Sequence, residues 1–161
     1  MNPEDYMKMA LKEAEKAFRA DEVPVGAVIV DPVGGAVVAK AHNLGEHGKD
    51  AAAHAELEAM RRACRKLKQN RLWGLDLYVT LYVTLEPCTM CAAAASLMRI
   101  RKIRFGAEDV KGGAVANGVR FYQAPTCHHR PEVEGGLLAD EASALLKAFF
   151  RGKRQKLSTK Q

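Results

Sequence analysis

Two short motifs bring together residue types that bind a metal ion and move protons. The first is the segment HAE at positions 54–56, and the second is PCTMC at positions 87–91. One imidazole and two thiolates suit Zn²⁺, and a catalytic zinc takes three protein ligands and leaves its fourth position to water. A carboxylate beside such an open site takes a proton from water and passes it to a leaving group. The motifs therefore predict a zinc hydrolase with three ligands and one proton carrier: His54, Cys88, Cys91 and, for the proton, Glu56.

The alternative is a closed structural site with a fourth protein ligand, taken from Cys127, His128 or His129. Glu56 argues against it, because a closed site has no use for a proton-carrying carboxylate. The same three residues could form a second metal site, but adjacent side chains seldom point at one ion, so a polar loop is favoured. Cys64 falls in a helical pattern that predicts a small buried side chain.

Helical periodicity predicts four helices, which must position these residues. The first begins at a capping residue, Asn2, with Pro3 in its first turn, where its missing N–H costs nothing. Two of the other helices begin at the two motifs. The predicted ranges are 2–20, 54–68, 89–99 and 137–150.

Short apolar segments predict the strands. Residues 24–30 and 36–42 flank a Gly-rich turn and predict a hairpin. Gly26 either allows a ligand or another backbone to approach closely, or is a glycine simply tolerated in a strand, and the two alternatives are about equal. The tandem repeat LYVTLYVT at 77–84 alternates with period two and predicts one long central strand. A further strand is predicted at 102–107. The stretch 108–136 reads as a long irregular segment with a short edge strand at Val133.

The motifs converge if both lie at helix starts. His54 and Glu56 are two residues apart and would diverge in the middle of a helix, but at a helix start both can project toward one centre. Cys88 and Cys91 are three apart and share a side of the first turn, where the helix N-terminus favours the thiolate. Alternating strands and helices predict an α/β fold with parallel strands and helices on both faces.

Length and composition fit one domain, 1–161, with a basic C-terminal tail at about 151–161. Of the 161 residues 48% are hydrophobic, and no apolar run approaches the ~18 residues of a membrane span. The N-terminus lacks a signal-peptide pattern, so we expect a cytoplasmic protein without a membrane partner. The net charge of +6 favours an acidic partner such as nucleic acid, although a solvated basic surface fits equally well.

The motifs, in this order and with Pro87 before the first cysteine, match the H-x-E and P-C-x-x-C signature of zinc-dependent nucleobase deaminases. Over nearly the whole chain the sequence resembles the bacterial tRNA-specific adenosine deaminases of the cytidine deaminase superfamily. The matching segments are EVPVGAV (22–28), AHAE (53–56), LYVTLEPCTMCA (81–92), FGAEDVKGGA (105–114) and LLADEASALLKAFFRGKRQ (137–155).

The resemblance implies a three-layer α/β/α cytidine-deaminase-like fold around a five-stranded mixed sheet, a homodimer, and one Zn²⁺ per subunit. It implies conversion of adenosine to inosine at the wobble position of a tRNA, with the anticodon stem-loop as partner. Asn43 matches the residue that holds the purine. Asp109 and Lys111 match a loop near the anticodon, and Phe150 and Arg151 match the C-terminal helix that touches RNA.

The chain departs from the family pattern in the LYVT duplication and in the 117–136 loop, where His128-His129-Arg130 replaces Asn-His-Arg. These departures keep one alternative open, and a second is independent of them. One is a deaminase of a free base or nucleoside, of the guanine or cytosine type, whose activity would depend little on salt. The other is a non-catalytic RNA-binding zinc subunit, which an intact Glu56 argues against.

Overall fold

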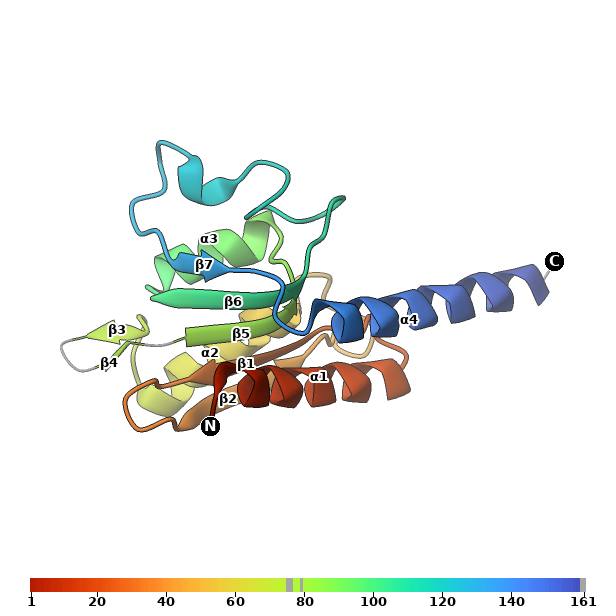
Figure 1. Ribbon diagram of the computed structural model, residues 1–161, viewed down its shortest axis with the longest axis horizontal. Helices are drawn as coiled ribbons and strands as arrows, with labels where there is room; N and C mark the ends of the chain where they lie inside the picture. The colour runs from red at the N-terminus through yellow and green to blue at the C-terminus, as the bar shows by residue number, and fades with distance from the viewer. Residues whose placement is uncertain (75–76, 79, 160–161) are drawn as a thin grey trace.

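A five-stranded sheet forms the centre of the molecule, in the order β2-β1-β5-β6-β7 (Figure 1). β1 (Gly26–Val30) pairs antiparallel with β2 (Val37–His42) and with β5 (Thr80–Leu85). β6 (Lys102–Ala107) is parallel to β5, and β7 (Glu132–Glu134) is parallel to β6. The predicted hairpin, the parallel pair and the short edge strand are all present, and the sheet is mixed as expected.

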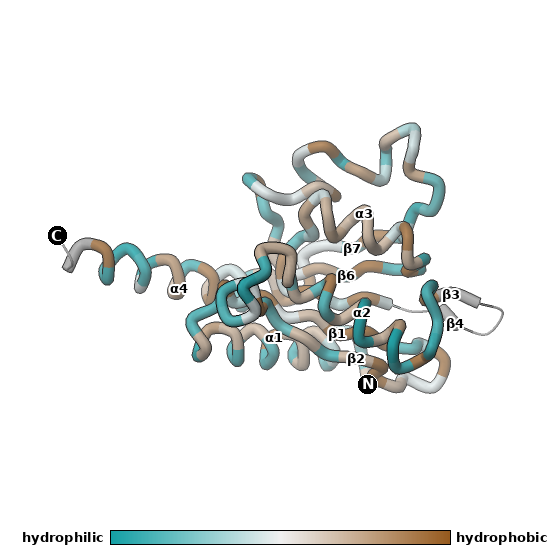
Figure 2. The backbone as a smooth tube through the Cα atoms, turned by 180° about the vertical axis from the view of Figure 1, so that it is seen from behind, coloured by the Kyte–Doolittle hydropathy of each residue, from teal (hydrophilic) through white to brown (hydrophobic). Residues whose placement is uncertain are grey.

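Helices cover both faces of the sheet in this computed structural model. α1 (Pro3–Arg19) and α4 (Ala139–Thr159) pack together on one face. α2 (Ala55–Leu67) and α3 (Thr89–Leu97) pack together on the other, which Figure 2 shows in front. A single 3₁₀ turn, η1 (Phe121–Gln123), lies beside α3 in the described part of the chain. The three layers confirm the predicted α/β/α architecture.

The structure describes residues 1–74, 77–78 and 80–159. Within these residues no helix combines the length and the apolar character needed to cross a membrane. The larger buried cluster joins the sheet to α2 and α3, and the smaller cluster joins the sheet to α1.

The start of α1 follows from its first residues. The Asn2 side chain accepts a hydrogen bond from the Asp5 N–H at 3.0 Å, and the Asp5 carboxylate accepts one from the Asn2 N–H at 2.9 Å. This reciprocal capping satisfies backbone donors that a helix start otherwise leaves unpaired. Pro3 occupies the first turn, as the sequence predicted.

At Gly26 the backbone of α1 packs directly on the backbone of β1. A Cβ at this position would collide with the Ala10 carbonyl oxygen and the Ala14 amide of α1. The Gly26 N–H donates to the Thr84 hydroxyl at 3.2 Å, which ties β1 to β5. Of the two alternatives for this glycine, the structure shows the close approach, and the approaching element is the backbone of α1.

The prediction of one long central strand over 77–84 is wrong. The main-sheet strand begins at Thr80, because its partners also end there: Thr80 faces Val30 on one side and Lys102 on the other. Unpaired backbone groups need other partners. The earlier repeat supplies β4 (Leu77–Tyr78), which pairs with β3 (Trp73–Gly74) in a separate two-stranded sheet. The remaining repeat residue, Val79, lies outside the described residues.

The last helix is longer than predicted. The sequence placed its end at Phe150 and read the following basic residues as a tail, but α4 continues to Thr159. Figure 1 shows α4 extending beyond the body of the molecule, at the end opposite β3 and β4. The basic segment is thus presented on a helix, with its side chains at fixed spacing.

Candidate metal centre and substrate cleft

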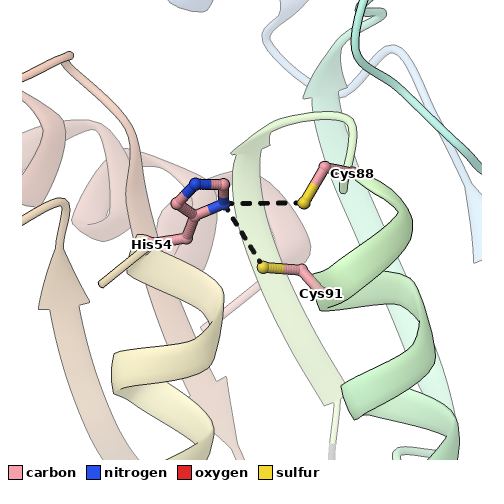
Figure 3. A group of neighbouring side chains, drawn as sticks. All are labelled: His54, Cys88 and Cys91. Carbon is pink, nitrogen blue, oxygen red and sulfur yellow. Dashed lines mark hydrogen bonds between the residues drawn. The ribbon is translucent and has the colours of Figure 1, made fainter. Parts of the chain in front are cut away.

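His54, Cys88 and Cys91 meet at the starts of two helices (Figure 3). His54 is the N-cap of α2, and Cys88 is the N-cap of α3, with Cys91 one turn further on. The Nδ1 atom of His54 lies 3.5 Å from the Cys88 sulfur and 3.6 Å from the Cys91 sulfur. The three residues predicted as metal ligands are therefore brought together.

These separations fit a tetrahedral zinc ion. With Zn–S bonds of about 2.3 Å and Zn–N bonds of about 2.0–2.1 Å, a tetrahedral angle places nitrogen and sulfur about 3.6 Å apart. All three ligand atoms lie within 4.8 Å of one another. Among the residues that the structure describes, the group that could hold a metal contains three residues, so a tetrahedral ion bound there would keep one position for water.

The electrostatics of the cysteine pair favour a thiolate at Cys88. The Cys91 thiol and the His54 imidazole beside it lower the pKa of Cys88 to about 4. The Cys88 sulfur in turn raises the pKa of His54, and Cys88 together with burial raises the pKa of Cys91. A divalent cation binds cysteine as the thiolate. Cys88 is already ionised at neutral pH, and Cys91 would lose its proton when the cation binds.

Glu56 lies in the first turn of α2 and is buried, with 4% of its surface exposed. Burial raises the pKa of Glu56 to about 7, and the carboxyl interacts with Cys91. A carboxyl group with this pKa both accepts and donates protons at neutral pH. The predicted convergence of His54 and Glu56 at a helix start is present.

Asn43 follows β2 and faces the start of α2. Its side-chain oxygen accepts a hydrogen bond from the Ala55 N–H at 2.7 Å. The side chain thus supplies the cap that the His54 side chain does not provide. This bond uses one lone pair of the oxygen, so the second lone pair and the amide NH₂ are the polar groups that the side chain can offer to the cavity.

Two adjoining cavities open at this centre. A cavity of about 200 Å³ is lined by Asn43, Glu56 and Asp109 together with the ligands His54 and Cys88. A larger one of about 1000 Å³ shares Asn43 and His54 with it and extends along the 43–53 loop to α4.

Two of the four remaining predicted substrate residues line these cavities and two do not. Asp109 lines the smaller cavity and Phe150 the larger one, where 44% of the Phe150 surface is exposed. Lys111 and Arg151 are also exposed but line neither cavity.

The loop that could have supplied a fourth ligand is fixed elsewhere. Cys127 is buried, and its thiol donates to the His129 carbonyl at 3.3 Å. The Ser96 hydroxyl donates to the same carbonyl at 2.6 Å, and the His129 ring contacts the Ile100 carbonyl at 2.6 Å. Ser96 and Ile100 lie at the end of α3 away from Cys88. In the described residues this cluster fixes the loop and does not join the metal group.

Two buried glutamates near the cleft have no counterpart in the sequence analysis. Glu22 precedes β1 and accepts hydrogen bonds from the N–H groups of Glu46 and His47. Glu86 follows β5 and accepts hydrogen bonds from the loop after β6. In both cases burial acts to raise the pKa, but the hydrogen bonds outweigh it and hold the pKa below its usual range. The sequence signal for both was an acidic residue next to a strand that is apolar enough to be buried: Glu22 comes before β1, and Glu86 follows β5.

Comparison with known proteins agrees with this geometry. A family model for MafB19-like deaminases matches residues 1–154. A tRNA-specific adenosine deaminase from Agrobacterium fabrum is 52% identical over 149 residues, which cover 92% of this chain and 94% of that protein.

Solved structures show the same fold. A tRNA deaminase that performs A-to-I editing at the wobble position has a TM-score of 0.83 and 51% identity, covering 88% of this chain and 99% of its own. A guanine deaminase from Nitrosomonas europaea has a TM-score of 0.81 at 25% identity, covering 92% and 84%. The chain therefore belongs to the deaminase family, and within it to the tRNA-specific adenosine deaminases.

Proposed function

We propose that this protein is a zinc-dependent hydrolytic deaminase that converts adenosine to inosine at the wobble position of a tRNA anticodon. The observation that carries the proposal is the juxtaposition of a three-residue metal group with the buried carboxyl of Glu56 in one cavity. The identities above 50% to tRNA-specific deaminases support adenosine in tRNA as the substrate.

Zinc bound by His54, Cys88 and Cys91 would supply a Lewis acid that lowers the pKa of water toward ~7. Glu56 accepts a proton from the water that attacks C6 of the purine and delivers it to the adjacent ring nitrogen. A second proton passes through Glu56 to the exocyclic amine, which leaves as ammonia. Adenosine and water thus give inosine and ammonia. The NH₂ group of Asn43 holds the purine in place.

The larger cavity suits the nucleotides that flank the reacting base. It joins the smaller cavity at Asn43 and His54 and reaches the exposed ring of Phe150. Bases of a single-stranded loop stack on aromatic side chains, and taking a base from such a loop costs less than taking it from a duplex. We assign Asp109, Lys111 and Arg151 to contacts with the surrounding RNA.

A deaminase of free bases is the second candidate, because the Nitrosomonas europaea guanine deaminase has nearly the same TM-score as the tRNA deaminase. Its identity to this chain is about half as high, which favours the tRNA substrate. A non-catalytic zinc subunit has no use for the buried Glu56 beside the metal group.

The test uses purified protein with its zinc content quantified. It is incubated with an anticodon stem-loop that carries a wobble adenosine, and in parallel with free adenosine, guanine and cytosine. Inosine in the stem-loop alone is the expected result. Ammonia released from a free base, with none from the stem-loop, would mean that the substrate is a free base and not tRNA. No turnover by zinc-loaded protein would favour a non-catalytic subunit.

The proposal includes a homodimer in the cytoplasm, in which the second subunit completes the RNA site. Exposed apolar side chains on α3, Met90 and Leu97, support a contact surface on this helix. Sedimentation velocity of the zinc-loaded chain measures the association state directly.

A further inference from the structure

Glu86 lies at the end of β5, immediately before the Pro87-Cys88 pair, and the proposed chemistry gives it no role. Only 2% of its surface is exposed. Its backbone N–H donates to the Ala107 carbonyl at 2.8 Å, which continues the contact between β5 and β6 by one residue. The side chain therefore starts from a residue whose backbone is hydrogen-bonded to the sheet.

The Glu86 carboxylate accepts five hydrogen bonds from the loop that follows β6. Oε1 accepts from the Asp109 N–H at 3.1 Å and from the Asn117 side-chain NH₂ at 2.6 Å. Oε2 accepts from three successive backbone N–H groups, those of Val115, Ala116 and Asn117, at 2.9–3.1 Å. A carboxylate offers about four lone-pair positions, so both oxygens are occupied and Glu86 is not left to carry protons.

This loop borders the cleft at its first residue. Asp109 lines the cavity beside the metal group, as Glu86 itself does, and Lys111 follows two residues later. Gly113 packs so closely on Glu86 that a Cβ at this position would collide with the carboxylate. The Ala114 N–H donates to the Pro87 carbonyl at 2.9 Å, which joins the loop to the turn that carries Cys88.

We propose that Glu86 is a positioning residue that fixes the 109–117 loop as one wall of the RNA-binding cleft. The substrate in this inference rests on the proposed function, but the anchoring of the loop is measurable without RNA. Glu86 acts through the loop, so its loss weakens substrate binding more than it slows the chemical step.

The opposite wall of the cleft is built in the same way. Glu22 accepts hydrogen bonds from the Glu46 N–H at 2.9 Å and from the His47 N–H at 2.8 Å, and its carboxylate contacts the His47 ring at 2.6 Å. Because β1 and β5 are antiparallel neighbours, the start of β1 and the end of β5 lie at the same edge of the sheet. Each wall therefore has its own buried carboxylate.

The substitution Glu86→Gln tests the inference in the full-length, zinc-loaded protein. Glutamine keeps the shape of the side chain but replaces one oxygen by an NH₂ group. Either orientation then places a donor against at least two of the loop donors, which leaves those groups unpaired. Glu22→Gln is the matched variant for the other wall. Glu134→Gln, on the exposed partner of Lys102 and Arg104, controls for the loss of one negative charge.

We expect Glu86→Gln to raise KM for the anticodon stem-loop on the order of tenfold, with kcat within about threefold of wild type and zinc content unchanged. Hydrogen exchange should accelerate at the amides of 109–117 in this variant and at those of 43–50 in Glu22→Gln. Glu134→Gln should change neither. A fall in kcat with unchanged KM, a loss of zinc, or unchanged exchange in 109–117 would each overturn the inference.

Asn117→Ala provides a second route if Glu86→Gln does not fold. It removes the shortest of the five hydrogen bonds from the loop side and leaves the carboxylate in place. It should accelerate exchange in 109–117 and raise KM in the same direction, by a smaller factor, and unchanged exchange would count against the anchor. If wild-type protein does not deaminate the stem-loop, the proposed function fails, while the exchange measurement still decides the role of Glu86.

Discussion

At the scale of single residues, the cleft separates two kinds of carboxyl group by their surroundings. Glu56 is buried with few donors around it, and its pKa is raised to about 7. Glu22 and Glu86 are similarly buried but accept two and four backbone hydrogen bonds, respectively, which hold their pKa values below the usual range. Burial alone thus does not identify a proton carrier. The number of hydrogen-bond donors around a buried carboxyl distinguishes a group that exchanges protons from one that holds a loop in place.

Glu56→Ala tests the proton carrier. We expect this variant to keep its fold and its zinc, because none of the three metal ligands changes, and to lose at least about 10³-fold in kcat. The matched control is Glu58→Ala. Glu58 lies two residues further along α2 and pairs with Arg61 at 3.9 Å, so this variant should retain activity. Inosine formation and zinc content are measured for both. Near-wild-type turnover by Glu56→Ala would refute the mechanism.

At the scale of elements, local signals predicted most of the structure. The cap at Asn2, the breaks at Pro87 and around Gly34, and the period of the apolar residues located α1, α2, α3, β1, β2 and β6 to within a few residues. The same signals correctly placed the metal group and Glu56 at the starts of two helices.

The misplaced elements depended on partners distant in sequence. Strand β5 begins where Val30 and Lys102 end the sheet, and neither limit is encoded in the LYVT repeat itself. The role of Glu86 depends on contacts with Asp109 and Asn117, which follow it in the sequence by 23 and 31 positions. Period and propensity do not report on such contacts, since they describe only neighbours along the chain.

Gly26→Ala tests the packing of α1 on the sheet. The added Cβ collides with the Ala10 carbonyl and the Ala14 amide, which are backbone atoms that cannot turn away. We expect a loss of about 1–3 kcal/mol in the free energy of unfolding, measured by urea denaturation. Gly152→Ala is the control, because its Cβ meets nothing within 4 Å on α4, and it should be neutral or stabilising by up to about 1 kcal/mol. An unchanged midpoint for Gly26→Ala would show that α1 shifts freely.

Glu22→Gln tests the stability that the second buried carboxylate provides. Its folded-state pKa is lowered, so the ionised group stabilises the fold at pH above its unfolded value of about 4.3, and this contribution is lost as pH falls through the folded value. The variant should lose about 1–3 kcal/mol at neutral pH. The difference from wild type should shrink below about pH 4. A difference that stays constant across pH would assign the effect to packing.

At the scale of the whole molecule, two separate segments rich in Lys and Arg are candidates for RNA contact. The segment 61–71, in the second half of α2 and just after it, contains six Lys and Arg residues and no acidic residue. The extension of α4 carries four more at 151–156, of which Lys153 contacts Asp21 at 2.8 Å. The α4 group follows Phe150, which lines the larger cavity, whereas the α2 group lies at the opposite end of its helix from His54.

This placement predicts that α4, and not the basic half of α2, contributes to RNA binding. Replacing Arg151 and Arg154 by glutamine should weaken binding of the anticodon stem-loop and reduce the slope of log K against log salt by about 1.5, since each phosphate contact contributes about 0.7–0.9. Arg61→Gln with Arg65→Gln removes the same charge from α2 and should leave the slope unchanged. Equal effects of the two pairs would mean that the net charge of +6 acts as a diffuse field. A larger effect of the α2 pair would place the RNA along α2, away from the helix that holds Phe150.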